Sequence, residues 1–581
     1  MEIDLAQLDS SATGSDLLRA PICIVGGGIA GLTLAHKLVT LGLEVLLLEA
    51  GGHTADAFDE IQQAGHAHPG TSELRPRALG GTSLTWGGQL LPFPPDSTSW
   101  PISSADLAPF TTEAEDLLAV DSLSYDAASF FTQLHQSAPI LLNQLPQLDA
   151  SLSKFTPFSH RNLAQTLGEK LRTHSKARII LHAQVTELLL ASTRDHIEAV
   201  LVRTPSGRPH RIEADHFILA AGTIETVRLL LTSQVGNQYD QVGRNFHDHL
   251  TVAAATLRAP ARTQLLQALR PWIYRGTLHS LKVYASPELR RQLNLTPILA
   301  HLTIDEPDDS CIGALRTLLR ARQQNNLAAA LGETMPQLPR ALADAARLTL
   351  SARTQRRRYV SPQAAVQLRL NAAQHTPSAS RLTLSPDLQP ILDWRVAPPE
   401  LATLRAFTQH LRAHLNLDGL DWNPSLLTHE LTAPIPDLDD ARHAMGGASM
   451  GTDSRTSVVD RDLRVHGLRA RFSRHLRQLV CTINRQKEVV RVRALLLEIR
   501  HAGHVTDLPV EHISTEAQVL RELLLLVDVR GGRGLSVELR IILELVRGHR
   551  PIASERFDRE RWQRVPGQCE TLRGVVRRAQ R

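Results

Sequence analysis

Two short apolar runs near the N-terminus flank a segment that has the apolar spacing of a helix. The runs cover residues 21–25 and 43–48. Glycines separate the first run from the helical segment, and the second run ends on an acid, Glu49. Because strands favour short apolar runs and helices favour apolar residues three and four positions apart, residues 19–52 are predicted to form strand, turn, helix and strand.

The same patterns predict further elements along the chain. Residues 178–188 alternate as strands do, and residues 217–230 show a strand, a glycine turn and a helix. Residues 311–355 have helical spacing with abundant arginine, whereas residues 53–78 are polar and predict a loop. Apolar runs long enough to span a bilayer, about 18 residues, are missing from the sequence.

Three glycines in the first turn meet the requirements of a dinucleotide-binding fingerprint. Gly26 permits a tight turn out of the strand, and Gly28 lets the backbone approach a pyrophosphate. Gly31 lets the helix pack close to the sheet. The helix N-terminus, with Ile29 and Ala30, offers N–H groups and a positive dipole to phosphates.

Glu49 follows Gly31 by 18 residues, where such a unit carries an acid that accepts hydrogen bonds from a ribose. A ribose 2′-phosphate would be repelled by this carboxylate, so a phosphorylated dinucleotide is disfavoured. The alternative is a glycine turn without a ligand, which the flanking strand and helix patterns disfavour. At this point FAD and NAD both stay open.

Composition and charge limit the function classes. A chain of 581 residues predicts more than one domain, and a net charge of +5 is too small to indicate a nucleic-acid partner. The four cysteines are far apart and form no CxxC pair, so neither a zinc site nor a disulfide framework is predicted. Residues 1–19 carry no pattern of a Sec or twin-arginine signal. A cytoplasmic protein without a transmembrane segment is expected, with export beside a signal-bearing partner left open.

Two histidine pairs raise the question of a metal site. His66 and His68 fall in the polar segment, where an exposed loop pair is favoured over half of a metal site because no third ligand lies nearby. His247 and His249 form a second pair. No metal is expected at either pair.

A second glycine-rich segment, residues 77–89, surrounds one tryptophan. Such a segment can lie flat against a planar ligand, or it can be a tight turn around a buried tryptophan. It resembles the flavin-contacting loop of the glucose-methanol-choline (GMC) oxidoreductase family, most closely the bacterial sugar-dehydrogenase-like branch. The resemblance implies FAD contacts from Gly80, Gly81, Thr82, Ser83, Trp86 and Gly87. Some members attach FAD through a histidine just before this tryptophan; Thr85 stands there, so non-covalent FAD is expected.

Later segments are similar to the same family. The resemblance places Val185 against the adenine, and Ala221 and Gly222 near the FAD diphosphate. Residues 242–249 match the next family segment, and residues 99–107 resemble the branch's lead into a helix, with Ser103 or Ser104 as the N-cap. Residues 374–384 and 391–394 resemble the substrate-domain sheet, although Ala373 stands where a glutamate is common.

His443 is the residue that the resemblance places over the reactive flavin nitrogen. Hydride transfer from an alcohol requires the hydroxyl proton to leave, and a group titrating near neutral pH is an efficient acceptor. The alternative is a structural histidine, and the surrounding match favours the catalytic role. The usual threonine-cysteine pair downstream is Gly447 and Ala448 here.

The predicted fold class is α/β, with an FAD-binding Rossmann-like domain of the glutathione-reductase type. This domain is expected to span residues 19–90, 178–250 and 436–467. An α+β substrate-binding domain built on an antiparallel sheet is expected over residues 91–177 and 251–435. The two domains are therefore interleaved in the sequence.

The family pattern stops after Gly467. Residues 468–581 hold 22 arginines and one lysine in 114 positions, and the position expected for a second catalytic histidine or asparagine falls on Asn484, in unmatched surroundings. One interpretation of this tail is a basic binding domain. The favoured one is an out-of-frame translation, because the change falls inside an expected motif.

Three functions follow from these predictions. The first is an FAD-dependent dehydrogenase or oxidase acting on the CH–OH group of an alcohol or sugar. The second is an FAD-binding remnant that does not turn over, and the third is a non-enzymatic binding protein that uses the basic tail. The branch implies a quinone or cytochrome as electron-acceptor partner. The residues do not separate oxidase from dehydrogenase.

Overall fold

The protein is described by a computed structural model. It covers residues 1–7, 19–56, 60–73, 75–92, 101–143, 145–307, 311–324, 347, 350–351, 353–374, 379–430 and 433–468. All of these residues lie within one compact unit, Met1–Glu516. The arginine-rich tail beyond Leu468, including Asn484, lies outside the described residues, so both interpretations of it stay predictions.

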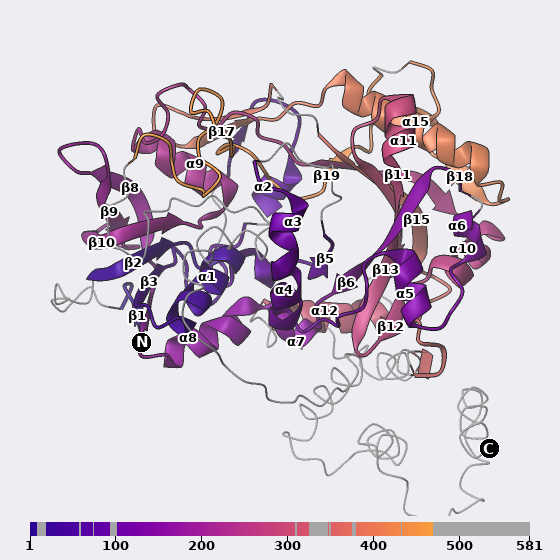
Figure 1. The fold of residues 1–581 in the computed structure, drawn as a ribbon, viewed down its shortest axis with the longest axis horizontal. Helices are drawn as coiled ribbons and strands as arrows, with labels where there is room; N and C mark the ends of the chain where they lie inside the picture. Colours follow the sequence, from indigo (N-terminus) through magenta and orange to yellow (C-terminus); the bar gives the residue numbers. More distant parts are fainter. Residues whose placement is uncertain are drawn as a thin grey trace, which may run out of the picture. The chain divides into compact units, whose positions relative to one another are not determined.

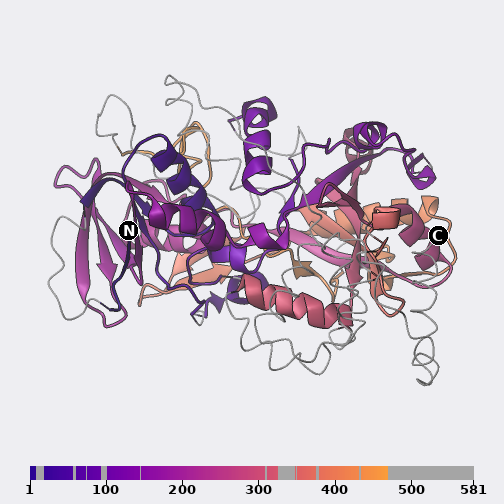
Figure 2. The same cartoon turned by 90° about the horizontal axis from the view of Figure 1, so that it is seen from below.

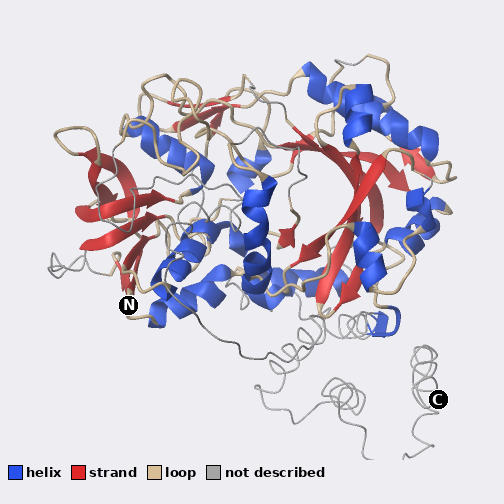
Figure 3. Cartoon of the chain, in the orientation of Figure 1, coloured by secondary structure: helices blue, strands red, loops and turns tan. Residues whose placement is uncertain are grey.

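A seven-stranded sheet carries the predicted N-terminal unit (Figures 1 and 3). Its order is β1 (Glu2–Asp4), β7 (Ala177–Leu181), β3 (Val45–Leu48), β2 (Arg19–Val25), β10 (Pro209–Leu219), β9 (Ile197–Arg203) and β8 (Gln184–Leu190). Neighbours from β1 to β10 are parallel, whereas β9 and β8 join antiparallel. Helix α1 (Ile29–Thr40) connects β2 to β3, which confirms the predicted strand, turn, helix and strand.

Burial explains why the two apolar runs became adjacent strands. Ile22 of β2 pairs in register with Val45 of β3, and both side chains are 1% exposed. Parallel strands covered on both faces are continuously apolar, as these are. Helix α1 packs against β2 and β3, and α9 (Gly222–Thr232) packs against β8. The predicted strand, glycine turn and helix over residues 217–230 are thereby confirmed.

A nine-stranded sheet forms a separate layer in both views (Figures 1 and 2). Its main path is β18 (Leu420–Trp422), β11 (His249–Leu257), β15 (Ala365–Ala373), β14 (Ile298–Asp305), β13 (Thr277–Ala285), β6 (Leu148–Phe155) and β5 (Gln89–Leu90). Two short strands complete it: β12 (Trp272–Tyr274) beside β13, and β19 (Asp439–Asp440) beside β11. The strand pairs described within it are antiparallel, in agreement with the predicted antiparallel sheet.

The two faces of this sheet differ in chemistry. Val252 and Leu370 point to one face, where they share a core with Leu404 and Phe407 of helix α15 (Pro398–His414). The alternate positions of the same strands, such as Arg369, are polar. Alternation of this kind is expected for an antiparallel sheet with one covered face.

The predicted place of residues 374–384 and 391–394 in the substrate-domain sheet was wrong for the two strands that they form. They form β16 (Arg381–Leu384) and β17 (Pro390–Asp393), which join β4 (Gln62–Gln63) in a three-stranded sheet instead of the large one. Leu382 N–H donates to Gly243 O at 2.9 Å, and β16 packs beside α9. The short alternating pattern predicted strands, but it carries no information about which sheet they join.

The segment predicted as a loop also holds structure, namely β4 and helix α2 (Pro69–Glu73). The Ser103 N-cap is confirmed for α3 (Ser104–Leu107), with a capping box to Asp106. Other helices are α4 (Thr111–Leu117), α5 (Ala127–Gln133), α6 (Ile140–Asn143), α7 (Phe158–Arg161), α8 (Glu169–Thr173), α10 (Ala261–Leu269), α11 (Pro287–Leu293) and α12 (Cys311–Gln323). Among the described residues, none of the helices is long and apolar enough to cross a membrane.

Candidate functional site

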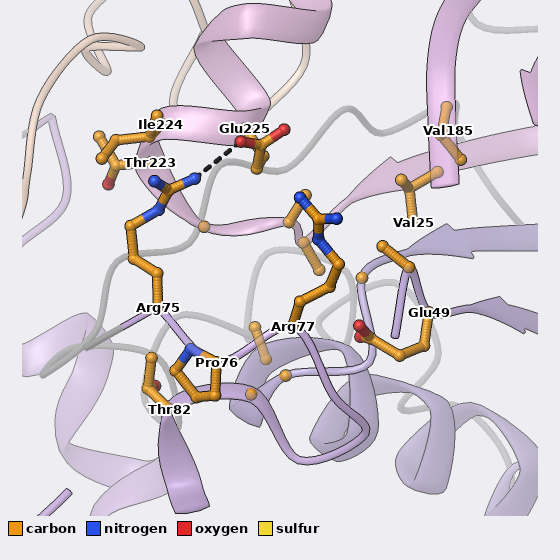
Figure 4. Close-up of a pocket in the computed structure, with 18 of the residues that line it drawn as sticks. Val25, Glu49, Arg75, Pro76, Arg77, Thr82, Val185, Thr223, Ile224 and Glu225 are labelled. Carbon is orange, nitrogen blue, oxygen red and sulfur yellow. Dashed lines mark hydrogen bonds and ion pairs between the residues drawn. The ribbon is translucent and has the colours of Figure 1, made fainter. Parts of the chain in front are cut away.

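A cavity opens at the carboxyl ends of β2 and β3 (Figure 4). The cavity has a volume of about 180 Å³. Ten of the fifteen predicted cofactor residues line it: Gly26, Gly28, Ile29, Ala30, Glu49, Gly81, Thr82, Val185, Ala221 and Gly222. Most of the residues predicted to bind the cofactor therefore line this cavity.

Two helices begin at this cavity. The N-caps of α1 and α9 are Gly28 and Ala221, and neither supplies a side-chain cap. The first N–H groups of both helices thus have no capping side chain, and both dipoles present their positive ends to the same space. This arrangement suits a ligand with two adjacent phosphates.

Two glycines of the first turn are required by geometry. Gly26 has φ +106°, and a Cβ there would lie 2.5 Å from Ala220 O. A Cβ on Gly31 would lie 1.9 Å from Gly26 O. Gly31 therefore does not touch the cavity; it allows α1 to start close enough to the turn for the cavity to form.

Glu49 is 7% exposed and lines the cavity. Its Oε2 accepts the Gly27 N–H at 2.8 Å and its Oε1 accepts the Gly51 N–H at 3.0 Å. Burial raises the pKa of Glu49, and these backbone donors together with Arg77 oppose the rise. Each carboxylate oxygen keeps a second lone pair that can accept a ribose hydroxyl.

Two arginines and a glutamate in the cavity were missed by the sequence predictions. The side chains of Arg75 and Arg77 point into the cavity in Figure 4. Arg75 Nη2 donates to Glu225 Oε1 at 2.8 Å, and Arg228 Nε donates to Glu225 Oε2 at 2.7 Å. Burial alone would raise the pKa of Glu225, but the two guanidinium groups outweigh it and lower that pKa. The available signal was positive charge at the start of residues 77–89 and two residues before them.

Five predicted cofactor residues do not line the cavity: Gly31, Gly80, Ser83, Trp86 and Gly87. Gly80 N–H donates to Gly27 O at 2.8 Å, which holds the loop against the first turn. Trp86 Nε1 donates to Arg161 O at 2.9 Å, and the Trp86 ring packs on the hydrophobic core. In the described residues this loop acts mainly by placing Gly81 and Thr82 at the cavity wall.

Val185 lines the cavity. Its carbonyl already accepts a hydrogen bond from Arg228 Nη2 at 3.1 Å. A second acceptor lone pair stays on that carbonyl. The assignment of Val185 to an adenine is compatible with this geometry.

His443 lies next to the cavity wall. Its neighbour Ala444 lines the cavity, and Ala444 O accepts the Thr223 hydroxyl from the first turn of α9 at 2.9 Å. The His443 N–H donates to Asp248 Oδ2 at 2.5 Å, and its ring meets the His249 ring edge-on at 5.7 Å. The structure therefore brings together the two family-like segments around residues 242–249 and 442–453.

His68 lies behind these two segments, and the expectation of an exposed histidine pair was wrong for it. Its side chain is fully buried, with Nε2 3.2 Å from Asp248 Oδ2 and Nδ1 3.4 Å from Asp440 Oδ2. Phe246 and Trp394 meet its ring edge-on. The expectation failed because the two acids are distant in the sequence.

The group His68, Asp248 and Asp440 offers ligand atoms within 4.8 Å of one another. All four carboxylate oxygens, however, already accept backbone N–H groups, from His249, His443, Arg442 and Gly70. Burial raises the pKa of Asp248, and the His68 contact opposes the rise. These buried carboxylates therefore hold the backbone N–H groups of Arg442 and His443 in place.

Comparison with family models identifies three parts of the chain. Models of GMC oxidoreductase match residues 163–251 and 376–470, and a model of an NAD(P)-binding Rossmann-like domain matches residues 24–73. The fructose dehydrogenase large subunit of Gluconobacter japonicus is 23% identical, over 40% of this chain and 59% of that relative. The chain therefore spans about three fifths of the length of the curated relative it matches.

Solved structures that match the chain include two enzymes named as oxidases. Pyridoxine 4-oxidase from Mesorbium loti matches with a TM-score of 0.50 and 15% identity, over 84% of this chain and 100% of that one. A formate oxidase from Aspergillus oryzae matches with a TM-score of 0.49 and 15% identity, over 84% and 99%. At such identities the first likeness concerns the fold alone, and it agrees with a Rossmann-like domain beside an antiparallel sheet.

Proposed function

The chain belongs to the GMC oxidoreductase family, and from this membership we propose that it is an FAD-dependent oxidoreductase acting on the CH–OH group of an alcohol or sugar. The observation that carries the proposal is the continuity of the cavity. It runs from Glu49, past the starts of α1 and α9, to Ala444 beside His443. The space proposed for the dinucleotide thus reaches the residue next to the candidate proton acceptor, although His443 itself does not line the cavity.

The residues present fit FAD. Glu49 would accept the adenosine ribose hydroxyls, and the N-termini of α1 and α9 would receive the diphosphate, with Arg75 and Arg77 adding positive charge. The pattern of glycines 26, 28 and 31 with Glu49 favours a dinucleotide without a 2′-phosphate. Thr85, in place of an attachment histidine, supports non-covalent binding.

Bound FAD would supply the acceptor for the hydride. His443 would take the hydroxyl proton on its imidazole ring, whose Nδ1 is buried. Asp248 holds the backbone of both His443 and His249 through its two carboxylate oxygens. A misplaced base slows the reaction strongly, and the fixed backbone of both histidines limits such misplacement.

An electron acceptor is the remaining partner. The relative from Gluconobacter is a "large subunit" by name, which supports an assembly in which a quinone or cytochrome takes the electrons from this chain. The small molecule oxidised is an alcohol or a sugar, as proposed from the resemblance.

Dye reduction tests this function. The purified chain is precipitated with acid, and FAD is measured in the supernatant; we expect release of FAD, as for a non-covalent cofactor. A panel of alcohols and sugars is then tested with an artificial acceptor. His443→Ala should lose about 100-fold or more in kcat, while His429→Ala, an exposed histidine, should keep wild-type activity. If FAD is bound but no member of the panel reduces the dye, the proposed activity is wrong.

That negative result is the signature of the second candidate function, an FAD-binding remnant without turnover. The observation behind it is that the C-terminal family match ends at residue 470, well inside the chain. In that case bound FAD and the absence of dye reduction would occur together, and His443→Ala would change neither.

A further inference from the structure

Three basic side chains lie in a row across the polar face of the nine-stranded sheet. Arg369 of β15 pairs in register with His301 of β14. Lys282 of β13 precedes Val283, which pairs with Ala300, so Lys282 lies on the other side of His301. Paired positions in antiparallel strands have Cβ atoms about 5 Å apart and share a face. We call Lys282, His301 and Arg369 the basic row.

Lys282 is the buried member of the basic row, whereas His301 and Arg369 are half-buried. Lys282 is only 4% exposed, and within the described part of the chain it forms no ion pair. His301 Nδ1 and Arg369 Nε are buried without a hydrogen-bond partner among the described residues. An unpaired cation in the protein interior is unfavourable, and most buried charges have an opposite charge beside them.

The effect of this burial is visible in the pKa values. Burial lowers the pKa of Lys282 to about 7. Burial, followed by the charges of Lys282 and Arg369, holds the pKa of His301 well below its usual range. Natural proteins keep locally unfavourable groups of this kind mainly where function uses them.

The face that carries the row is the one nearest His443. Along β11, His249 begins the strand and its ring contacts His443. Ala253, on the same face four residues later, pairs with Arg369, which places it about 13 Å from His249 along the strand. The small Ala253 side chain covers little of Arg369. The opposite face is closed by α15.

We propose that the basic row binds an anionic group of the substrate, so that the chain oxidises an alcohol or sugar that also carries a carboxylate or a phosphate. This proposal rests on the proposed function. A neutral sugar offers no charge to offset Lys282 and Arg369, whereas an anion offers acceptors to all three side chains. The distance along β11 leaves room for several bonds between the oxidised carbon and the anionic group.

Matched substrates test this specificity. The purified FAD-loaded chain is assayed by dye reduction with an alcohol that carries a carboxylate, with its neutral amide and with a phosphate analogue, at constant ionic strength. We expect kcat/KM for one of the anions to exceed that for the amide by about 10-fold or more. This advantage should fall by about 10-fold in Lys282→Met and in Arg369→Gln, and should stay in Lys170→Met, an exposed lysine on α8. The preferred anion distinguishes a carboxylate from a phosphate site. Equal kcat/KM for anions and amide, or an unchanged advantage in both variants, overturns the proposal.

A binding measurement separates this proposal from the proposed function. If no alcohol reduces the dye, the proposed function fails, and the basic row is judged by titrating acetate or inorganic phosphate against sodium chloride at matched ionic strength. One of these anions should raise the thermal unfolding temperature of the wild type and of Lys170→Met, but not that of Lys282→Met. Failure of both anions to stabilise the wild type, or equal stabilisation of Lys282→Met, overturns the anion site.

Discussion

Replacing Lys282 by methionine should stabilise the protein in a pH-dependent way. Burial lowers the pKa of Lys282 to about 7 from the ordinary 10.5. Between these values the unfolded chain binds a proton that the folded chain does not, so this group makes stability rise with pH. The slope is about 1.4 kcal/mol per pH unit. Below pH 7 both states bind the proton, and the full cost of about 5 kcal/mol is present.

The assay compares wild type, Lys282→Met and Lys170→Met in urea unfolding between pH 6 and pH 9. Lys282→Met should be more stable than the wild type by about 3–5 kcal/mol at pH 6. The difference should shrink as pH rises, because the free energy of unfolding of the wild type increases when the buried Lys282 loses its proton. Lys170→Met should change stability by less than about 0.5 kcal/mol at every pH. A Lys282→Met variant that is less stable than the wild type, or a difference that does not change with pH, would refute the reasoning.

The other predictions concern the cavity and its support. Glu49→Gln should weaken FAD binding by about 10-fold or more, because one hydrogen bond to a charged acceptor contributes about 1.5–3 kcal/mol. Flavin fluorescence titration measures the affinity, and an unchanged affinity would contradict the assigned ribose contact. Gly31→Ala should lose FAD and fold poorly, since its Cβ would lie 1.9 Å from a carbonyl oxygen. The control Gly168→Ala, whose Cβ would have contacts of 3.6 Å or more, should be tolerated. Equal FAD content in the two purified variants would show that the close approach at Gly31 is unimportant. Asp248→Asn should lower kcat by about 100-fold through misplacement of His443 while FAD content stays unchanged, and wild-type kcat in a variant with full FAD would exclude a positioning role.

Local geometry explains what the sequence could predict. Gly26 and Gly31 are required by contacts with residues of the same turn or the adjacent strand, and β2 and β3 are continuous apolar runs because the sheet covers both of their faces. The contact of Gly31 with Gly26 and the pairing of β2 with β3 act within about 30 residues, whereas the contact of Gly26 with Ala220 joins segments far apart in the sequence. The N-terminal unit was therefore predictable, and most of the residues expected at its ligand site do line a cavity.

Contacts between distant segments explain what the sequence could not predict. His68 is buried because Asp248 and Asp440 meet it from two other segments, and nothing in its own neighbourhood indicates this. The hairpin β16–β17 joins β4 instead of the large sheet for the same reason. Spacing in the sequence predicts the periodicity of an element, but it does not determine which element lies opposite.

Lys282 shows the same limit in another form. A lysine within an alternating strand is normally placed on a solvated face. Here the alternation is correct, but Lys282 itself is buried in the folded chain. The sequence shows neither the low exposure of Lys282 nor that it forms no ion pair among the described residues.

The central claim is that one cavity joins an FAD site to His443, and reduction of the bound flavin by substrate tests it most directly. The purified chain is mixed with each member of the alcohol and sugar panel without oxygen, and the flavin absorbance is followed in wild type and in His443→Ala. The account predicts a protein that carries FAD, rapid bleaching by at least one substrate, and bleaching about 100-fold slower or more in the variant. A purified chain without flavin, or a flavin that His443→Ala leaves just as reducible, would contradict it.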